Sequence, residues 1–156
     1  MPPTVIFIRH AQAIHNVDKL YPKPCDTGTP ATTLATEFPT FDFSALDPIY
    51  PDKTSPAGAA YQYSQGAVLA RGRSALADLY KRPEDVVVVV SHSGFMRTAV
   101  VGRWFGNADY RVFDLGGCEG REGEGGLVEW ELTRGRGGMG RSREEKVVVG
   151  EKLPEV

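Results

Sequence analysis

Two histidines, each placed after a short apolar run, are the residues of this chain best suited to do chemistry. Arg9 and His10 directly follow residues 5–8, and His92 follows a run of valines at residues 86–90. A neutral imidazole offers a basic or nucleophilic nitrogen, and a guanidinium offers a planar fork of donors that matches phosphate or carboxylate. Buried strands commonly have polar ends, so the first pair alone is ambiguous. The repetition of the pattern predicts an anion site with a reactive imidazole.

The two apolar runs are predicted to be neighbouring strands. Residues 5–8 and 86–90 are mostly β-branched and have the length of strands. The valine run shows no polar alternation, which indicates a central strand covered on both faces. Parallel neighbours lie roughly 4.8 Å apart, so this pairing would place His10 beside His92. Both would then lie at the carboxyl edge of the sheet, where open α/β sheets bind ligands.

The order of the remaining elements predicts an α/β fold. The spacing of apolar residues indicates helices over residues 61–81 and 95–105, so that strand, helix, strand and helix follow one another. Edge strands are predicted at residues 110–115, 127–133 and 146–149. We therefore expect a mostly parallel central sheet that is flanked by helices.

Loops are expected to connect these elements. Prolines and glycines interrupt the first third of the chain, where we expect only a short helix at residues 31–37. We interpret residues 38–58 as an ordered loop, because its aromatic side chains need burial. The glycine-rich stretches at residues 116–126 and 135–140 are expected to be mobile.

The composition is that of a globular domain, which we expect to span residues 1–156 as one unit. The chain has 41% hydrophobic and 24% charged residues. We place the core at about residues 4–115 and treat residues 116–156 as glycine-rich edge strands and a tail. A net charge of −2 argues against binding to nucleic acid or a membrane. Two cysteines without near partners, and no leader or spanning segment, indicate a cytoplasmic protein without a metal site.

Further groups are expected to converge on the two histidines. Ser93 and Gly94 begin the helix after the second histidine, so their backbone N–H groups would face the same place. Asn16 lies six residues after the first histidine and could fold its amide back. Together with Arg9, these groups would make a phosphate pocket.

Two motifs of the chain resemble those of a known enzyme family. The first is R-H-A-Q-A-I-H-N at residues 9–16, which resembles the R-H-G-x-T-x-x-N signature of the histidine phosphatase, or phosphoglycerate mutase-like, superfamily. The second is S-H-S-G-F-M-R at residues 91–97, which resembles the second histidine motif of that superfamily. Two more segments, P-C-D-T-G at residues 24–28 and P-D-K-T-S-P-A-G at residues 51–58, look like its fungal branch. The resemblance covers roughly residues 5–114.

The resemblance implies a phosphoglycerate mutase-like fold and a metal-free phosphoryl transfer through a phosphohistidine, without a cofactor. By position, His10 would be the nucleophile. Its attacking nitrogen must be unprotonated, so the other ring nitrogen should donate to a backbone carbonyl. Arg9, Asn16 and His92 would hold the phosphoryl oxygens and spread the charge that develops on them.

The chain also departs from the family pattern. Ala11 and Ala13 replace the Gly and Thr of the signature. Family members carry a strand–helix unit between the two motifs, which supplies a second phosphate-binding arginine and an acid for the leaving group, and that unit is missing here. The arginines that could take the first role are Arg71, Arg73 and Arg97, although their helical settings favour a structural one. The candidate acids are Asp18, Asp26 and Glu37, none of which matches the family position.

These observations favour a phosphomonoesterase that acts on a small phosphorylated or carboxylated metabolite and is weakened by the missing arginine and acid. Two alternatives stay open. One is a degenerate family member that binds an anion or a partner without turnover. The other is a repurposed isomerase or dehydratase of secondary metabolism that uses His10 and His92 as an acid–base pair. A trimmed sheet would expose an edge or an apolar face, so a homodimer is also expected.

Overall fold

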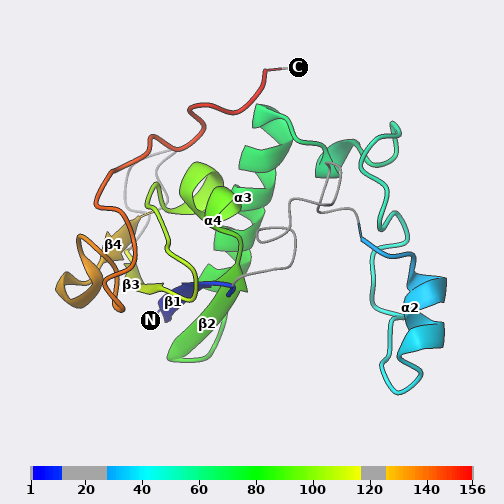
Figure 1. The fold of residues 1–156 in the computed structure, drawn as a ribbon, viewed down its shortest axis with the longest axis horizontal. Coiled ribbons are helices and arrows are strands. Elements are labelled where there is room, and N and C mark those ends of the chain that lie inside the picture. The colour runs from blue at the N-terminus through cyan, green and yellow to red at the C-terminus, as the bar shows by residue number, and fades with distance from the viewer. Residues whose placement is uncertain (1, 12–27, 117–125, 156) are drawn as a thin grey trace. The chain divides into compact units, whose positions relative to one another are not determined.

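The computed structural model describes residues 2–11, 28–116 and 126–155 (Figure 1). The chain divides into two compact units. The first joins residues 1–12 to residues 64–156, and the second is residues 13–63. The expected single domain over residues 1–156 stays a prediction.

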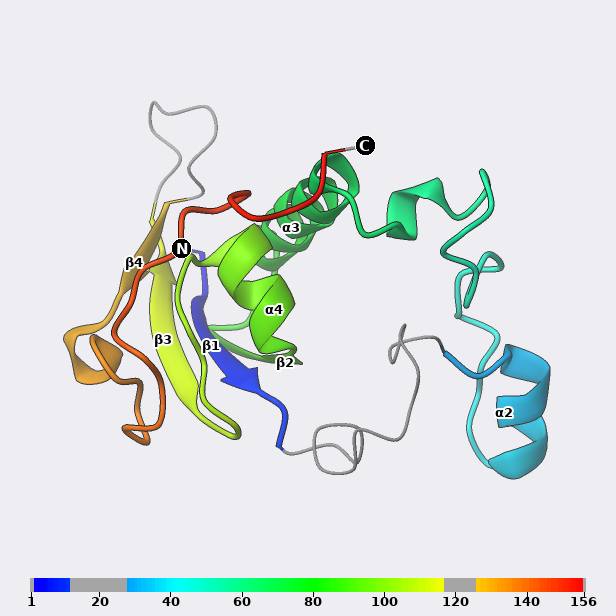
Figure 2. The same cartoon turned by 45° about the horizontal axis from the view of Figure 1, so that its top comes forward.

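Four strands form one mixed sheet in the first unit, in the order β2-β1-β3-β4 (Figure 2). β1 pairs parallel with β2 and antiparallel with β3, which pairs antiparallel with β4. The α/β class is as predicted, but the expectation of a mostly parallel sheet is wrong. β3 begins beside the carboxyl end of β1, where Arg9 N donates to Asp109 O at 3.0 Å, so it must run back along β1. The strands are β1 (Thr4–Arg9), β2 (Val86–Ser91), β3 (Tyr110–Leu115) and β4 (Leu127–Glu129).

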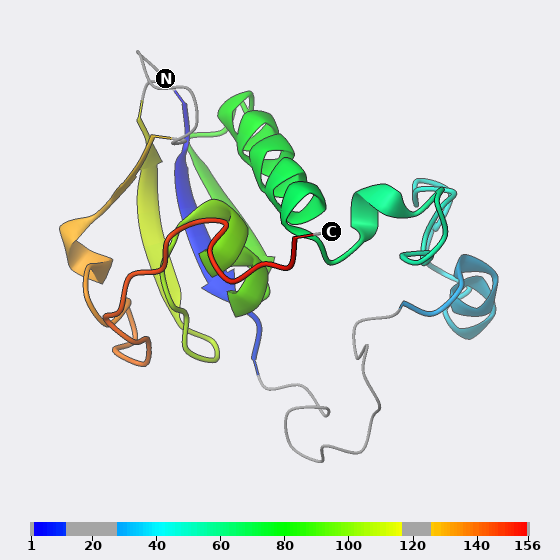
Figure 3. The ribbon, with the colours of Figure 1, turned by 90° about the horizontal axis from the view of Figure 1, so that it is seen from above.

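Helices cover one face of this sheet (Figure 3). The helix α3 (Gln65–Tyr80) begins after Ser64, whose hydroxyl accepts a hydrogen bond from Ala67 N. The second helix consists of α4 (Ser93–Phe95) and the π-helical turn η2 (Met96–Val100). It ends earlier than the predicted residue 105, because Gly102 adopts a φ of +63°, the left-handed conformation that ends helices.

The hydrophobic core lies between the covered face of the sheet and these helices. The rings of Phe7 and Phe113 meet edge to face with their centroids 5.8 Å apart. Gly72 lets the backbone of α3 approach η2, since a Cβ at this position would collide with Ala99 O. This packing fixes the helices against β1 and β2. The other buried members of the core are Val5, Val68, Met96, Val100, Phe105, Leu115 and Leu153.

The opposite face of the sheet is open over β2. Val86, Val88 and Val90 are 54%, 55% and 64% exposed, and they alternate with the half-buried Val87 and Val89. The expectation of a central strand covered on both faces is therefore wrong. β2 is an edge strand, and no described strand lies beyond it. The sequence does not distinguish the exposed face of β2 from its covered face, because valine occupies both.

A buried ion pair ties β3 to β4. Arg111 is 1% exposed, and its Nη1 donates to Glu129 Oε1 at 2.6 Å. The same guanidinium donates to the backbone carbonyl oxygens of Trp104, Thr133 and Gly135. Arg111 therefore holds two irregular segments of the chain against the sheet.

Asp109 anchors the glycine-rich stretch at residues 135–140. Its buried carboxylate accepts hydrogen bonds from the backbone N–H groups of Met139 and Arg141 and from the hydroxyl of Ser142. The stretch that we expected to be mobile is thus hydrogen-bonded to the start of β3. The other glycine-rich stretch lies mostly outside the described residues.

The remaining edge strands are shorter than the sequence predicts. β4 ends at Glu129, and the 3₁₀ turn η3 (Glu131–Thr133) follows it. Residues 146–149 contribute only an isolated bridge, between Lys146 and Arg103. Within the described chain, no helix has the length and apolar character that crossing a bilayer requires.

The described part of the second unit holds the predicted helix, α2 (Ala31–Glu37), and a 3₁₀ turn, η1 (Ala59–Tyr61). Between them the chain turns at three aspartates, Asp42, Asp47 and Asp52, each of which accepts a hydrogen bond from the backbone N–H two residues on.

The aromatic side chains of this loop are less buried than expected. Phe41 is 68% exposed and Phe38 is 48% exposed, although their rings meet edge to face. The burial that we expected is therefore wrong for these two residues. The loop takes its order from hydrogen-bonded turns, and not from a core of its own.

Because one arginine pairs in the core and another on the surface, replacing each by methionine should lower the free energy of unfolding by very different amounts. Arg111→Met leaves Glu129 Oε1 and several carbonyl groups without their donor, although Arg103 still pairs with Glu129 Oε2 at 3.1 Å, so the free energy of unfolding should fall by about 3 kcal/mol. Arg82→Met breaks the exposed ion pair with Glu84 and should cost less than about 1 kcal/mol. Urea unfolding measures both values, and equal losses would contradict the structural role of Arg111.

The shifted pKa of Asp109 should make the stability of the fold depend on pH. Burial alone would raise the pKa of Asp109, but its hydrogen bonds, led by that from Ser142, lower it below the ordinary value. A lowered native pKa stabilises the fold above the unfolded pKa of about 3.9, and this contribution is lost as the pH falls through the native pKa. The stability difference between wild type and Asp109→Asn should therefore be largest near neutrality and shrink on acidification. Urea unfolding at several pH values measures it, with the exposed Asp78→Asn as control, and a constant difference would refute this reasoning.

Candidate active site

The register between β1 and β2 places the two histidines side by side. Arg9 pairs with Ser91, and the pairing continues one step beyond the strands, where His10 N donates to Ser91 O at 3.1 Å. His10 and His92 occupy the next position of the same register. Their ring centroids are 4.5 Å apart at an interplanar angle of 70°, and His10 Nε2 lies 3.0 Å from His92 Nδ1. The structure thus brings together the two residues on which the sequence-based hypothesis depends.

The hydrogen bonds of this pair fix the position of its protons. His10 Nδ1 lies 2.6 Å from Ala11 O, and a carbonyl oxygen can only accept, so Nδ1 carries a proton. The lone pair of a neutral His10 is then on Nε2. Since Nε2 accepts, the proton of the bond between the two rings belongs to His92 Nδ1. The result is a nucleophilic nitrogen that faces a proton donor.

Arg9 contributes a half-buried guanidinium to this edge of the sheet. Its Nη1 donates to Phe105 O at 3.1 Å, whereas its buried Nε has no hydrogen-bond partner among the described residues. Burial, and then the nearby charge of Arg97, lowers the pKa of Arg9 below its ordinary value. An arginine still keeps its proton in such surroundings, so Arg9 has a charge and unused donors to offer an anion.

Arg97 brings a second guanidinium close to Arg9. Its Cζ lies 3.8 Å from the centroid of the Trp104 ring, and Arg143 Cζ lies 4.9 Å from the same centroid. Within the described ranges, none of these three arginines forms an ion pair with a carboxylate. Neighbouring like charges without a counter-charge make this edge attractive to an anion.

Ser93 and Gly94 follow directly after His92, in α4. Ser93 Oγ is buried and has no hydrogen-bond partner among the described residues, which makes it a candidate ligand contact. A Cβ built on Gly94 would meet nothing within 4 Å. α4 has only three residues before the π-helical turn, so a helix dipole adds little to the backbone N–H groups that we expected to face the site.

The other predicted site residues lie outside the described residues, in the second unit, or on α3. Asn16, Asp18 and Asp26 lie outside the described residues. Glu37 is the last residue of α2 in the second unit, and it is exposed. The remaining candidates are Arg71, which is half-buried, and Arg73, which is exposed, both on α3.

The loop before β3 supplies contacts that sequence reasoning missed. Ala108 N donates to His10 O at 3.5 Å, which places this loop beside the first histidine. Asn107 Oδ1 is buried there without a hydrogen-bond partner among the described residues. The sequence Gly106-Asn107 is typical of a helix end, and nothing in its spacing indicates a ligand.

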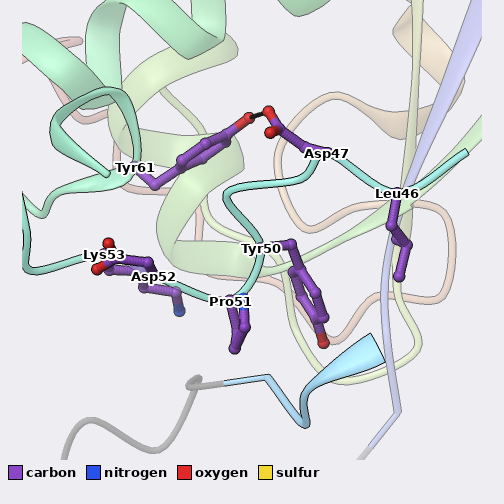
Figure 4. A pocket seen from close by; sticks show the side chains of 7 residues that line it. All are labelled: Leu46, Asp47, Tyr50, Pro51, Asp52, Lys53 and Tyr61. Carbon is purple, nitrogen blue, oxygen red and sulfur yellow. Dashed lines mark hydrogen bonds between the residues drawn. The ribbon is translucent and has the colours of Figure 1, made fainter. Parts of the chain in front are cut away.

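A hollow of about 160 Å³ lies within the second unit (Figure 4). The Tyr61 hydroxyl donates to the Asp47 carboxylate at its rim and lowers the pKa of Asp47 below the ordinary value. The lining contains no histidine or cysteine, so it offers no nucleophile of the kind described above. The lining residues are Leu46, Asp47, Tyr50, Pro51, Asp52, Lys53 and Tyr61.

The chemistry available to the histidine pair is that of the residues around it. Comparison with family models, with curated proteins and with solved structures gave no match. Across the described ranges, no three His, Cys, Asp or Glu side chains come close enough together to hold a metal ion.

The proton positions can be tested directly by NMR of the imidazole nitrogens. In alkaline solution, His10 should be protonated on Nδ1 and His92 on Nδ1, because Ala11 O and His10 Nε2 are the acceptors. Replacement of His92 by alanine should leave the proton of His10 on Nδ1. A signal that shows His10 protonated on Nε2, as is common for free histidine, would contradict the hydrogen-bond chain.

Proposed function

We propose that this chain is a phosphomonoesterase that works through a phosphohistidine, as its resemblance to histidine phosphatases implies. The observation that carries the proposal is the hydrogen-bond chain from Ala11 O through His10 to His92. It leaves the lone pair of His10 Nε2 as the nucleophile and places a proton donor next to it. Arg9 and Arg97 add positive charge where phosphoryl oxygens would lie.

The reaction proceeds in two balanced steps. First, the lone pair of His10 Nε2 forms a bond to phosphorus while the bond from phosphorus to the ester oxygen breaks, and the departing alcohol takes a proton from solvent. Second, water attacks phosphorus and gives up a proton to solvent, while the P–N bond breaks and its electron pair returns to Nε2 as phosphate leaves. His92 Nδ1–H turns from His10 to a phosphoryl oxygen when the substrate enters, and donates to it throughout.

The described residues place no carboxylate in hydrogen-bond contact with either imidazole. An acid that protonates the leaving group contributes roughly 10²–10⁴-fold to a rate. We therefore propose slow turnover that favours substrates whose alcohol leaves easily, such as aryl phosphates. The natural substrate belongs to the class of small phosphorylated metabolites.

Substitution of the nucleophile provides the test. With an aryl phosphate, His10→Asn should lower kcat by at least about 10³-fold, because it removes the nitrogen whose lone pair attacks phosphorus. His92→Asn should lower kcat by roughly 10²-fold, since it removes one donor to the phosphoryl group. The control is Lys81→Asn, a change to the same residue at the exposed end of α3, which should retain wild-type kcat. Full activity in His10→Asn would refute the proposal.

A second function is favoured by a specific observation. The two imidazoles are already in hydrogen-bond contact at 3.0 Å, which also suits an acid–base pair that moves a proton in a carboxylated metabolite. Loss of a phosphorus-free isomerisation in both His10→Asn and His92→Asn would favour that isomerase or dehydratase. Tight binding of inorganic phosphate at Arg9 without any turnover would favour the non-catalytic anion-binding alternative.

A further inference from the structure

We propose that a second copy of this chain pairs with the free edge of β2, antiparallel to it and around a two-fold axis at Val88. The pairing would join two four-stranded sheets into one. It would also bring an acidic segment of the partner to the histidine site, where the described residues of one chain supply no carboxylate contact.

The backbone of β2 has hydrogen-bonding groups available on its outer side. Thr4 N donates to Asp85 O and His10 N donates to Ser91 O, so the odd-numbered residues of β2 turn their backbone groups toward β1. Val86, Val88 and Val90 therefore direct their N–H and C=O groups outward. Among the described residues, none forms a hydrogen bond with these groups.

This edge lacks the features that normally keep edge strands apart. From Val86 to Ser91 the strand contains no charge, no proline and no glycine, and it pairs with β1 without a bulge. Its alternate valines are more than half exposed. An edge of this kind favours strand addition, in which backbone hydrogen bonds give affinity and side-chain pairs give specificity.

Symmetry restricts the partner and the register. In an isologous dimer the same strand lies on both sides of the axis, so an antiparallel pair must have one residue opposite itself. The five valines overlap completely only when that residue is Val88, which sets Val86 opposite Val90. Valine then meets valine at every position, and β-branched pairs directly opposite each other stabilise antiparallel sheets.

The two ends of β2 carry complementary charge. Glu84 and Asp85 precede the strand, and His92 follows it beside Arg9. In the register centred on Val88, Glu84 of the partner subunit lies opposite His92. Among the described residues, Glu84 forms one ion pair, an exposed one with Arg82, which costs little to break. This self-complementarity is the reason to assign the edge to a second copy rather than to an unrelated strand.

Disulfide trapping tests the register, in a background where Cys25 and Cys118 are replaced by serine. Residues opposite each other in a hydrogen-bonded antiparallel pair have Cα atoms about 5.5 Å apart, within the range that a disulfide spans. Val88→Cys should therefore form a covalent dimer with itself on mild oxidation. Val86→Cys should do so only when mixed with Val90→Cys. The control is Val128→Cys, at an equally exposed valine on β4, and equal crosslinking of Val128→Cys and Val88→Cys would overturn the proposal.

Light scattering coupled to size-exclusion chromatography tests the oligomeric state without relying on activity. Wild type should elute as a dimer at micromolar concentration. Val88→Lys places two like charges opposite each other on the axis and should weaken the dimer about tenfold or more, whereas Val128→Lys should leave it intact. Circular dichroism checks that both variants are folded. A monomeric wild type, or equal weakening by the two lysines, would overturn the proposal and would leave the phosphatase proposal standing.

Discussion

The parallel pairing of β1 with β2 is the constraint on which the candidate site depends. The residues that follow the two strands meet only because Arg9 pairs with Ser91, and a slip of one residue would turn one imidazole to the other face. Five identical valines cannot specify this register through their side chains. It must be set by the ends of the pair, where backbone hydrogen bonds reach Asp85 and Ser91, and by the helices that join the strands.

The site is also supported from β3, through buried polar groups. Arg111 holds the carbonyl of Trp104, and the next residue, Phe105, accepts a hydrogen bond from the Arg9 guanidinium. Asp109 fixes the glycine-rich stretch against the start of β3, and its own carbonyl oxygen accepts from Arg9 N. The charge beside the histidines is therefore positioned by residues that do not touch them. This polar network links the stability of the fold to the geometry of the candidate site.

The sequence predicts where β1, β2, β3, α2 and α3 lie and the meeting of the two histidines, because apolar runs and their polar ends are local features, but it extends the second helix and β4 too far. It does not reveal that β2 is an edge strand, since valine occupies its exposed and its covered face alike. It also misses Asn107 and the anchoring of residues 135–140 by Asp109, because both depend on contacts between segments far apart in the chain. Tertiary contacts of this kind leave no periodic pattern.

The most direct test of the account is to trap the phosphorylated protein during turnover of an aryl phosphate and to locate the group by mass spectrometry. We expect one phosphoryl group on His10, attached through Nε2, that survives alkali and is lost in acid, as is typical of a phosphoramidate. Replacement of His10 by asparagine should abolish it. A phosphoryl group that survives acid, as an ester on Ser93 would, or turnover without any label on His10, would contradict the account.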